Sequence, residues 1–358
     1  MKSSFDSSFK LSDISAPTIH SDKCRLLDQG LWPIHTSGRA NSSLSPTFGF
    51  QEIRTLEGIN YFSPTGSVLS FPKPEEPLRV LFLTSLRDVA VEEGVGKFAN
   101  IHGKRRYIKG TIETALEAVA DQRLEGFAEI VGIVFDDLEK DVRNTEYALD
   151  PLSSQEWIYP LDLLTQSGQS SLDITYHIPS EFRLLPLLDK EGRYYKKLEF
   201  ESKLFNLMQT LEADVIISDH YLAKIEFLIS PDHFGLFGRV LNTHPGITRQ
   251  GYIYHCRGYH TDEEAINHVL GYATDPDTGE KFCVTPHDRT GACFHIVSES
   301  FDQGPILCDA ELTPVFLSDK EERQAFVRRI YETSKNPVFL NGLKHYASNV
   351  YPAISKLK

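Results

Sequence analysis

Short apolar runs alternate with amphipathic stretches through most of this chain, and this alternation limits the possible folds more than any other feature. Leu78–Thr84 is an apolar run of strand length, and Thr111–Gln122 carries Ile112, Leu116 and Val119 at helical spacing. The alternation continues with the stretches 129–135, 172–176, 194–211 and 215–217. It predicts an α/β fold in which helices flank a mostly parallel, twisted sheet.

The pattern changes in the last third of the chain. Thr261 opens a helix with a capping box, and the runs 292–297 and 305–315 flank a turn. The segment 318–321 caps a final helix. We therefore expect a C-terminal β-hairpin and helix to follow the parallel strands.

Shifts in composition divide the chain into three parts. Residues 1–76 are rich in Ser with weak periodicity, and Pro72–Pro77 is typical of a linker. We expect 1–76 to be a partly irregular N-terminal extension, 77–318 to be the main domain, and 319–358 to be a helical tail packed on that domain.

Composition and charge favour a cytoplasmic protein with no membrane segment and no nucleic-acid partner. Hydrophobic residues make up 41% of the chain, and no apolar run approaches the ~20 residues of a membrane span. The N-terminus lacks the apolar core of a secretory signal. The five cysteines are odd in number and scattered, which is typical of reduced thiols rather than of disulfides or a zinc site. A net charge of −13 disfavours a nucleic-acid partner.

Three polar side chains carry the strongest functional signal. Asn242 and His244 follow the apolar run Gly238–Leu241, and Pro245 pushes His244 into extended backbone. Residues two apart in an extended chain face the same side. The carboxyl end of a strand is also where open α/β sheets bind their ligands. Asp302, in the turn of the predicted hairpin, supplies a carboxylate to the same region.

The motifs around these residues resemble those of the folate-dependent formyltransferases, typified by glycinamide ribonucleotide transformylase. Four motifs occur in the family's order: Asn242-Thr243-His244-Pro245, Arg257-Gly258, Gly291-Ala292-Cys293-Phe294-His295 and Asp302-Gln303-Gly304-Pro305-Ile306. The resemblance implies a Rossmann-like formyltransferase fold, with 77–318 as the catalytic domain.

Departures from the family pattern narrow the choice of acceptor substrate. The turn Thr84–Asp88 stands where ribonucleotide-binding members have a glycine-rich phosphate cradle, and a long insertion with Arg105 follows it. A predicted hairpin at 272–281 lengthens the segment after His244. The short stretch after the last strand does not match the extra domain of tRNA-formylating relatives. The chain looks most like the N5-hydroxyornithine formyltransferases of siderophore biosynthesis.

The resemblance also assigns roles to residues. It implies that Asn242, His244 and Asp302 are catalytic, with 10-formyltetrahydrofolate as co-substrate and no metal. The residues expected to hold the folate are Ser218, Asp219, His220, Tyr221, Leu222, Val297 and Phe301. Those expected to contact the acceptor are Arg87, Arg105, Arg257 and Gly258. His295 is expected to be a core or supporting residue.

The chemistry of the three residues fits formyl transfer independently of the family. Transfer from N10 of a reduced folate to an amine passes through a tetrahedral oxyanion, and one well-placed donor is worth on the order of 10²–10³ in rate. Asn242 and a protonated His244 supply such donors, and His244 can also move the proton, which is worth roughly 10²–10⁴-fold.

Three other functions stay open at this point. A formyltetrahydrofolate deformylase would use the same three residues with water as acceptor. Glycinamide ribonucleotide transformylation would need Arg87 or Arg105 to bind the phosphate. A non-enzymatic α/β binding protein would be expected to show a damaged triad, and all three residues are present.

Overall fold

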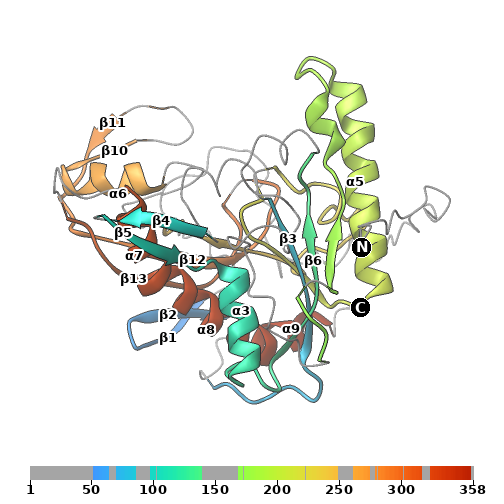
Figure 1. Ribbon diagram of the computed structural model, residues 1–358, viewed down its shortest axis with the longest axis horizontal. Coiled ribbons are helices and arrows are strands. Elements are labelled where there is room, and N and C mark those ends of the chain that lie inside the picture. Colours follow the sequence, from blue (N-terminus) through green and yellow to red (C-terminus); the bar gives the residue numbers. More distant parts are fainter. Residues whose placement is uncertain are drawn as a thin grey trace.

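A nine-stranded sheet with helices on both faces organises the part of the chain that the computed structural model describes (Figure 1). The described residues are 51–63, 70–85, 97–101, 103–138, 168–171, 173–221, 223–248, 261–274, 279, 281–300, 302–316 and 323–355. The predicted caps at 318–321 lie outside these residues.

The parallel half of the sheet is formed by five adjacent strands. In spatial order they are β9 (Val240–His244), β8 (Val215–Ser218), β3 (Leu78–Thr84), β6 (Ala128–Phe135) and β7 (Thr175–His177). Since five of the nine strands are parallel to one another, the predicted mostly parallel α/β fold is confirmed.

Four antiparallel strands extend the sheet beyond β9. They are β12 (Arg289–Ile296), β13 (Ile306–Pro314), β2 (Ile59–Ser63) and β1 (Gln51–Leu56). The pair β12–β13 is the predicted C-terminal hairpin. Because β2 pairs with β13, residues from the expected N-terminal extension lie in the same sheet as the main domain.

Two small hairpins lie outside the main sheet. The strands β10 (Tyr272–Thr274) and β11 (Lys281–Cys283) form the hairpin predicted after His244. The strands β4 (Lys97–Ile101) and β5 (Lys104–Ile108) form a second one, within the insertion after β3. The sequence pattern did not predict β4 and β5, because both are short and contain charged residues.

Helices cover both faces of the sheet (Figure 1). Those before β12 are α3 (Thr111–Ala120), η2 (Glu181–Leu184), α5 (Lys190–Thr210) and α6 (Thr261–Val269). The C-terminal run consists of α7 (Arg323–Ile330), η3 (Tyr331–Lys335), α8 (Asn336–His345), η4 (Tyr346–Val350) and α9 (Tyr351–Ser355), of which η3 and η4 are π-helical. None of the helices in the described part of the chain is long and apolar enough to cross a bilayer.

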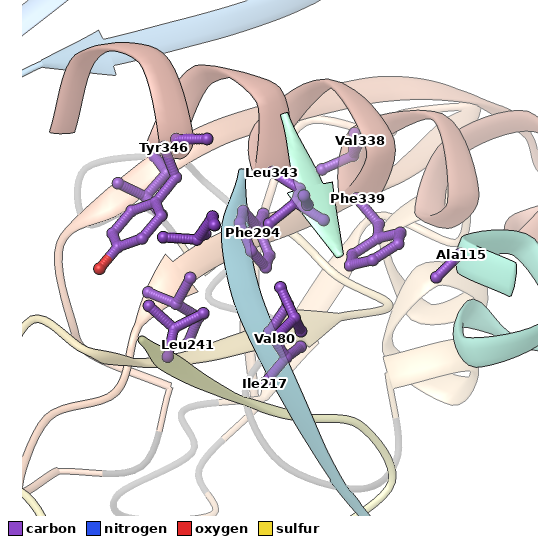
Figure 2. Close-up of a cluster of buried hydrophobic side chains, with 14 of the residues drawn as sticks. Val80, Ala115, Ile217, Leu241, Phe294, Val338, Phe339, Leu343 and Tyr346 are labelled. Carbon is purple, nitrogen blue, oxygen red and sulfur yellow. The ribbon is translucent and has the colours of Figure 1, made fainter. Parts of the chain in front are cut away.

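The central strands are apolar on both sides because each face is covered by helices. On β3, Val80 and Phe82 pack in one core cluster, whereas Leu81 and Leu83 pack in another. The first cluster lies under α3 and α8, and Figure 2 shows its side chains between the sheet and the C-terminal helix. The second lies under α5. The C-terminal run therefore completes the core.

Close contact between α8 and the sheet depends on Gly342. A Cβ atom at this position would lie 2.5 Å from Cδ1 of Phe294 and 2.7 Å from Sγ of Cys308. We expect Gly342→Ala to lower the free energy of unfolding by about 1–3 kcal/mol, because overpacking outweighs the gain in helix propensity. Urea unfolding checks this. Asn341→Ala is the control, and equal stability of both variants would contradict the contact.

Burial of His268 on α6 makes stability depend on pH. Its side chain is buried, and burial is the main reason that its pKa is lowered to about 4. Glu264 opposes the shift and His287 adds to it. In the unfolded chain the ordinary pKa is ~6.5. Between these values only the unfolded state binds the proton, so stability falls as the pH falls.

The matching experiment compares the wild type with His268→Gln. Between pH 7.5 and 4.5 the wild type should lose about 2–3 kcal/mol more of its free energy of unfolding than the variant. Urea titrations at the two pH values measure the difference, in which all other titrating groups cancel. Equal losses would show that His268 titrates normally in the folded protein.

Candidate active site

The candidate site lies at the carboxyl end of β9, where Asn242 and His244 end the strand. Asn242 is paired with Ser218 of β8 on one side and with His295 of β12 on the other. His244 is paired with Cys293 of β12 and is 6% exposed. This register places the two predicted side chains on one face, between a parallel and an antiparallel neighbour.

Asp302 comes from the connection between β12 and β13. Its backbone has a φ of 51°, which a non-glycine residue adopts at a cost. Two glycines of the hairpin motifs allow close backbone contact around it. A Cβ at Gly304 would lie 1.7 Å from the carbonyl oxygen of Ile296, and one at Gly291 would lie 1.8 Å from that of Ala310. The motif glycines therefore let the hairpin close and bring Asp302 back to β9.

The carboxylate of Asp302 lies between an amide and two imidazoles. Its Oδ1 accepts a hydrogen bond from Nδ2 of Asn242 at 3.3 Å and lies 3.6 Å from Nε2 of His295. Its Oδ2 lies 3.7 Å from Nδ1 of His244. The structure thus brings together all three residues predicted to be catalytic. The separation from His244 exceeds a direct hydrogen bond, as catalytic contacts often do before a ligand binds.

His295 orients the amide of Asn242. Nδ1 of His295 lies 3.0 Å from the carbonyl oxygen of Ile296 and donates to it, which leaves Nε2 to face the amide of Asn242. Nδ2 of Asn242 lies 3.2 Å from this nitrogen. The amide hydrogens of Asn242 therefore face His295 and Asp302. His295 is 1% exposed, so it is a core residue as its strand position suggested, and its side chain contacts Asn242.

The residues expected to hold the folate lie in two segments beside these side chains. Ser218, Asp219, His220 and Tyr221 lead out of β8, and the amide of Asp219 donates to the carbonyl oxygen of Leu83 at 2.9 Å. Val297 follows β12, and its amide donates to Val240 at 2.8 Å. Leu222 and Phe301 lie outside the described residues.

The residues expected to contact the acceptor are less well placed by the structure. Arg105 lies on β5. Arg87, Arg257 and Gly258 lie outside the described residues. Their assignment stays a prediction.

A buried ion pair anchors the segment after β8. Nζ of Lys335 donates to Oδ1 of Asp219 at 2.9 Å, and the two side chains are 1% and 3% exposed. Burial alone would raise the pKa of Asp219. The positive charge of Lys335 more than offsets this effect, with a further contribution from His220, and the pKa is lowered. Asp219 is therefore a carboxylate inside the protein, neutralised by a lysine from the C-terminal run.

His220 is held by the same C-terminal turn. Its backbone is left-handed, with a φ of 57°, and its ring stacks on Tyr331 at 5.8 Å between centroids. Nε2 of His220 lies 2.5 Å from the hydroxyl of Tyr331. Burial, together with the charge of Lys335, lowers the pKa of His220 to about 4, so the ring is neutral at pH 7.

Tyr331 and Lys335 are the residues at this site that the sequence did not reveal. They lie far from the motifs along the chain, in a helical segment that carries no motif of its own. A lysine in such a segment is usually exposed. Only the packing of η3 against the end of β8 buries it.

A second buried carboxylate lies beyond β3, away from β9. Asp136 follows β6, and its Oδ2 accepts from Oγ of Ser180 at 2.7 Å. Its Oδ1 accepts from Oγ of Ser85, which follows β3, and Nε of Arg183 lies 3.9 Å from Oδ2. Ser85 belongs to the turn that stands in place of the phosphate cradle. The end of β3 therefore lies next to a buried carboxyl group that two serine hydroxyls and Arg183 surround.

The fold is similar to that of folate-dependent formyltransferases of known structure. No protein-family model and no curated protein matches the chain. Among solved structures, the N10-formyltetrahydrofolate-dependent formyltransferase PvdF of pyoverdin biosynthesis is 29% identical, with a TM-score of 0.65. The match covers 75% of this chain and 99% of PvdF. It confirms the resemblance inferred from the motifs.

Two further structures are similar at lower scores. Glycinamide ribonucleotide transformylase 1 from Symbiobacterium toebii is 14% identical with a TM-score of 0.44, over 76% of this chain and 89% of that one. A formyltetrahydrofolate deformylase from Burkholderia mallei is 16% identical with a TM-score of 0.41, over 75% of this chain and 64% of that one.

The buried ion pair generates a stability prediction. Lys335→Met leaves Asp219 charged and unpaired inside the protein, so we expect a loss of about 3–5 kcal/mol in the free energy of unfolding. Lys335→Met/Asp219→Asn removes the orphaned charge and should recover more than half of that loss. Urea unfolding at pH 7 measures both. A double variant no more stable than the single one would show that the loss comes from packing.

Proposed function

We propose that this protein is an N-formyltransferase that moves a formyl group from 10-formyltetrahydrofolate to a small amine or hydroxylamine. The observation that carries the proposal is the convergence of Asn242, His244 and Asp302 at the carboxyl end of β9. The similarity to PvdF, which depends on N10-formyltetrahydrofolate, supports the co-substrate.

The three side chains would divide the work of the transfer. The nitrogen of the acceptor attacks the formyl carbon, and the electrons of the carbonyl bond move to oxygen. Asn242 and protonated His244 would donate hydrogen bonds to this oxyanion, one amide hydrogen turning from its long contact with Asp302 or His295. When the carbonyl bond reforms, the bond from carbon to N10 breaks. The proton lost by the acceptor then passes to N10.

A neutral His244 would take that proton from the attacking nitrogen, donate to the oxyanion as an imidazolium and then pass the proton to N10, while Asp302 would hold His244 in position. The carboxylate lies close enough to stabilise an imidazolium, and the gap of 3.7 Å between Oδ2 and Nδ1 shortens readily when charge develops. Both side chains are largely buried, so water competes weakly for these contacts. His295, which touches Asn242, would act as a positioning residue.

The two loops beside the triad would hold the co-substrate. Ser218, Asp219, His220 and Tyr221 would contact the folate from the end of β8, and Val297 from the end of β12. Leu222 and Phe301 extend the same two segments along the chain.

The acceptor we propose is a small amine or hydroxylamine of the N5-hydroxyornithine type. Asp136 lies buried behind Ser85 and accepts a hydrogen bond from its hydroxyl, so a carboxyl group lies close to the place where a phosphate-binding enzyme needs donors. A carboxylate there is compatible with an acceptor that carries an ammonium group. PvdF acts in pyoverdin biosynthesis, which supports an acceptor of siderophore type. Arg87, Arg105, Arg257 and Gly258 stay predicted acceptor contacts.

The direct test follows release of tetrahydrofolate spectroscopically with a panel of acceptors. The panel contains N5-hydroxyornithine, ornithine, glycinamide ribonucleotide and an amino-sugar nucleotide. Release that requires the hydroxylamine supports the proposal. Release without any acceptor would identify a deformylase, release with the ribonucleotide would identify the purine-type transferase, and no release at all would favour a binding protein.

Variants then test the triad. We expect His244→Ala to lower kcat/KM by roughly 10²–10⁴-fold while folate affinity changes by less than about tenfold, because the lost group acts on the proton. Asp302→Asn should lower kcat without unfolding the protein. His287→Ala is the control. His287 precedes the first residue of β12, whereas the triad lies at the other end of that strand, and it pairs with Glu311. An unchanged rate in His244→Ala would overturn the mechanism.

A further inference from the structure

A chain of hydrogen bonds runs from Lys335 through Tyr331 to His220. We propose that Tyr331 and Lys335 are positioning residues that hold the imidazole of His220 neutral, with its proton on Nδ1. The loop after β8 would then present a fixed, uncharged N–H donor to the polar edge of the reduced pterin. The identity of the ligand rests on the proposed function, whereas the tautomer of His220 is inferred from the hydrogen bonds alone.

The donors and acceptors in this chain fit one arrangement of their hydrogens. An ammonium group donates and never accepts, and Nζ of Lys335 lies 2.9 Å from Oδ1 of Asp219 and 2.9 Å from the hydroxyl of Tyr331. The hydroxyl of Tyr331 therefore accepts from Lys335, which leaves its own hydrogen available to Nε2 of His220 at 2.5 Å. Since Nε2 accepts, the proton of the neutral ring is on Nδ1.

The surroundings of His220 keep the ring uncharged. Nζ of Lys335 lies 3.5 Å from Nε2, where a second positive charge would be repelled. Oδ1 of Asp219 lies 3.9 Å from the same nitrogen, but its charge is already engaged by Lys335. The side chain of His220 is 13% exposed, so solvation of an imidazolium is poor. Burial accordingly dominates the low pKa of this ring.

Nδ1 of His220 is the end of the chain that is left for a ligand. Within the described residues both hydrogen-bond contacts of the ring are made by Nε2. His220 follows Ser218 by two residues, and Ser218 is the register partner of Asn242. A left-handed backbone at His220 fixes the direction in which the ring leaves the loop. A neutral donor on the loop after β8 suits the carbonyl oxygen or a ring nitrogen of a pterin.

The turn that supplies Tyr331 and Lys335 is itself held firmly. Both belong to η3, whose π-helical geometry brings residues four apart to the same side. Tyr331 is 1% exposed and packs with Ile108 of β5 and Val327 of α7. The hairpin β4–β5 and the C-terminal run thus support the hydroxyl that orients His220.

The test uses Tyr331→Phe, which removes one hydroxyl and keeps the ring stack. In folate-free protein with ¹⁵N-labelled histidine, the wild type should show a neutral His220 with the proton on Nδ1 at pH 7. The signal is assigned by its loss in His220→Asn. In Tyr331→Phe the Nε2–H tautomer should become populated. The KM for 10-formyltetrahydrofolate should rise about 5- to 10-fold, with kcat within about twofold.

Tyr346→Phe is the matched control. Tyr346 opens the second π-helical turn, is fully buried, and donates to the carbonyl oxygen of Gly238 at 2.8 Å. Its removal should lower the thermal midpoint comparably and leave the tautomer and KM unchanged. A wild-type His220 that is protonated on Nε2, or an equal effect of both variants on KM, would overturn the inference. If the wild type has no activity with 10-formyltetrahydrofolate, the proposed function is overturned. The tautomer is tested separately, because the spectrum is recorded without folate.

Discussion

The antiparallel pairing of β12 with β9 is the interaction on which the site depends. It sets His295 opposite Asn242 and Cys293 opposite His244, and the hairpin then returns Asp302 to the same edge. Strand side chains alternate between faces, so a slip of one residue would separate these groups. The close contacts at Gly291 and Gly304 keep the hairpin in this register. The geometry of three polar side chains is thus decided by backbone pairing.

Two buried carboxylates divide the carboxyl edge of the sheet into regions of different character. Asp219 is paired with Lys335, so the charge of this carboxylate after β8 is neutralised inside the protein. Asp136, bound by two serine hydroxyls and near Arg183, lies on the other side of β3. Because buried charges interact strongly, the two sides of β3 differ in their electrostatic environment.

Local patterns predicted the elements with strong periodicity and missed those that depend on distant contacts. The strands β3, β6, β8 and β9 were identified from their apolar runs, as were α3 and α5. The strand β7 begins at Thr175, later than predicted, because it is short and only half-buried. The hairpin β4–β5 was not predicted. Besides being short and charged, it packs through Ile108 against Val327 and Tyr331, which come from the C-terminal run.

By itself the sequence determined the α/β class, the position of Asn242 and His244 at a strand end, and the resemblance to formyltransferases. These follow from local periodicity and from motifs whose residues are neighbours in the chain. Only the tertiary structure decided that Lys335 and Tyr331 reach Asp219 and His220, which lie more than a hundred residues away. The reason is physical: the burial of an ammonium group, the tautomer of an imidazole and the pairing of charges depend on neighbours in space, which local sequence does not encode.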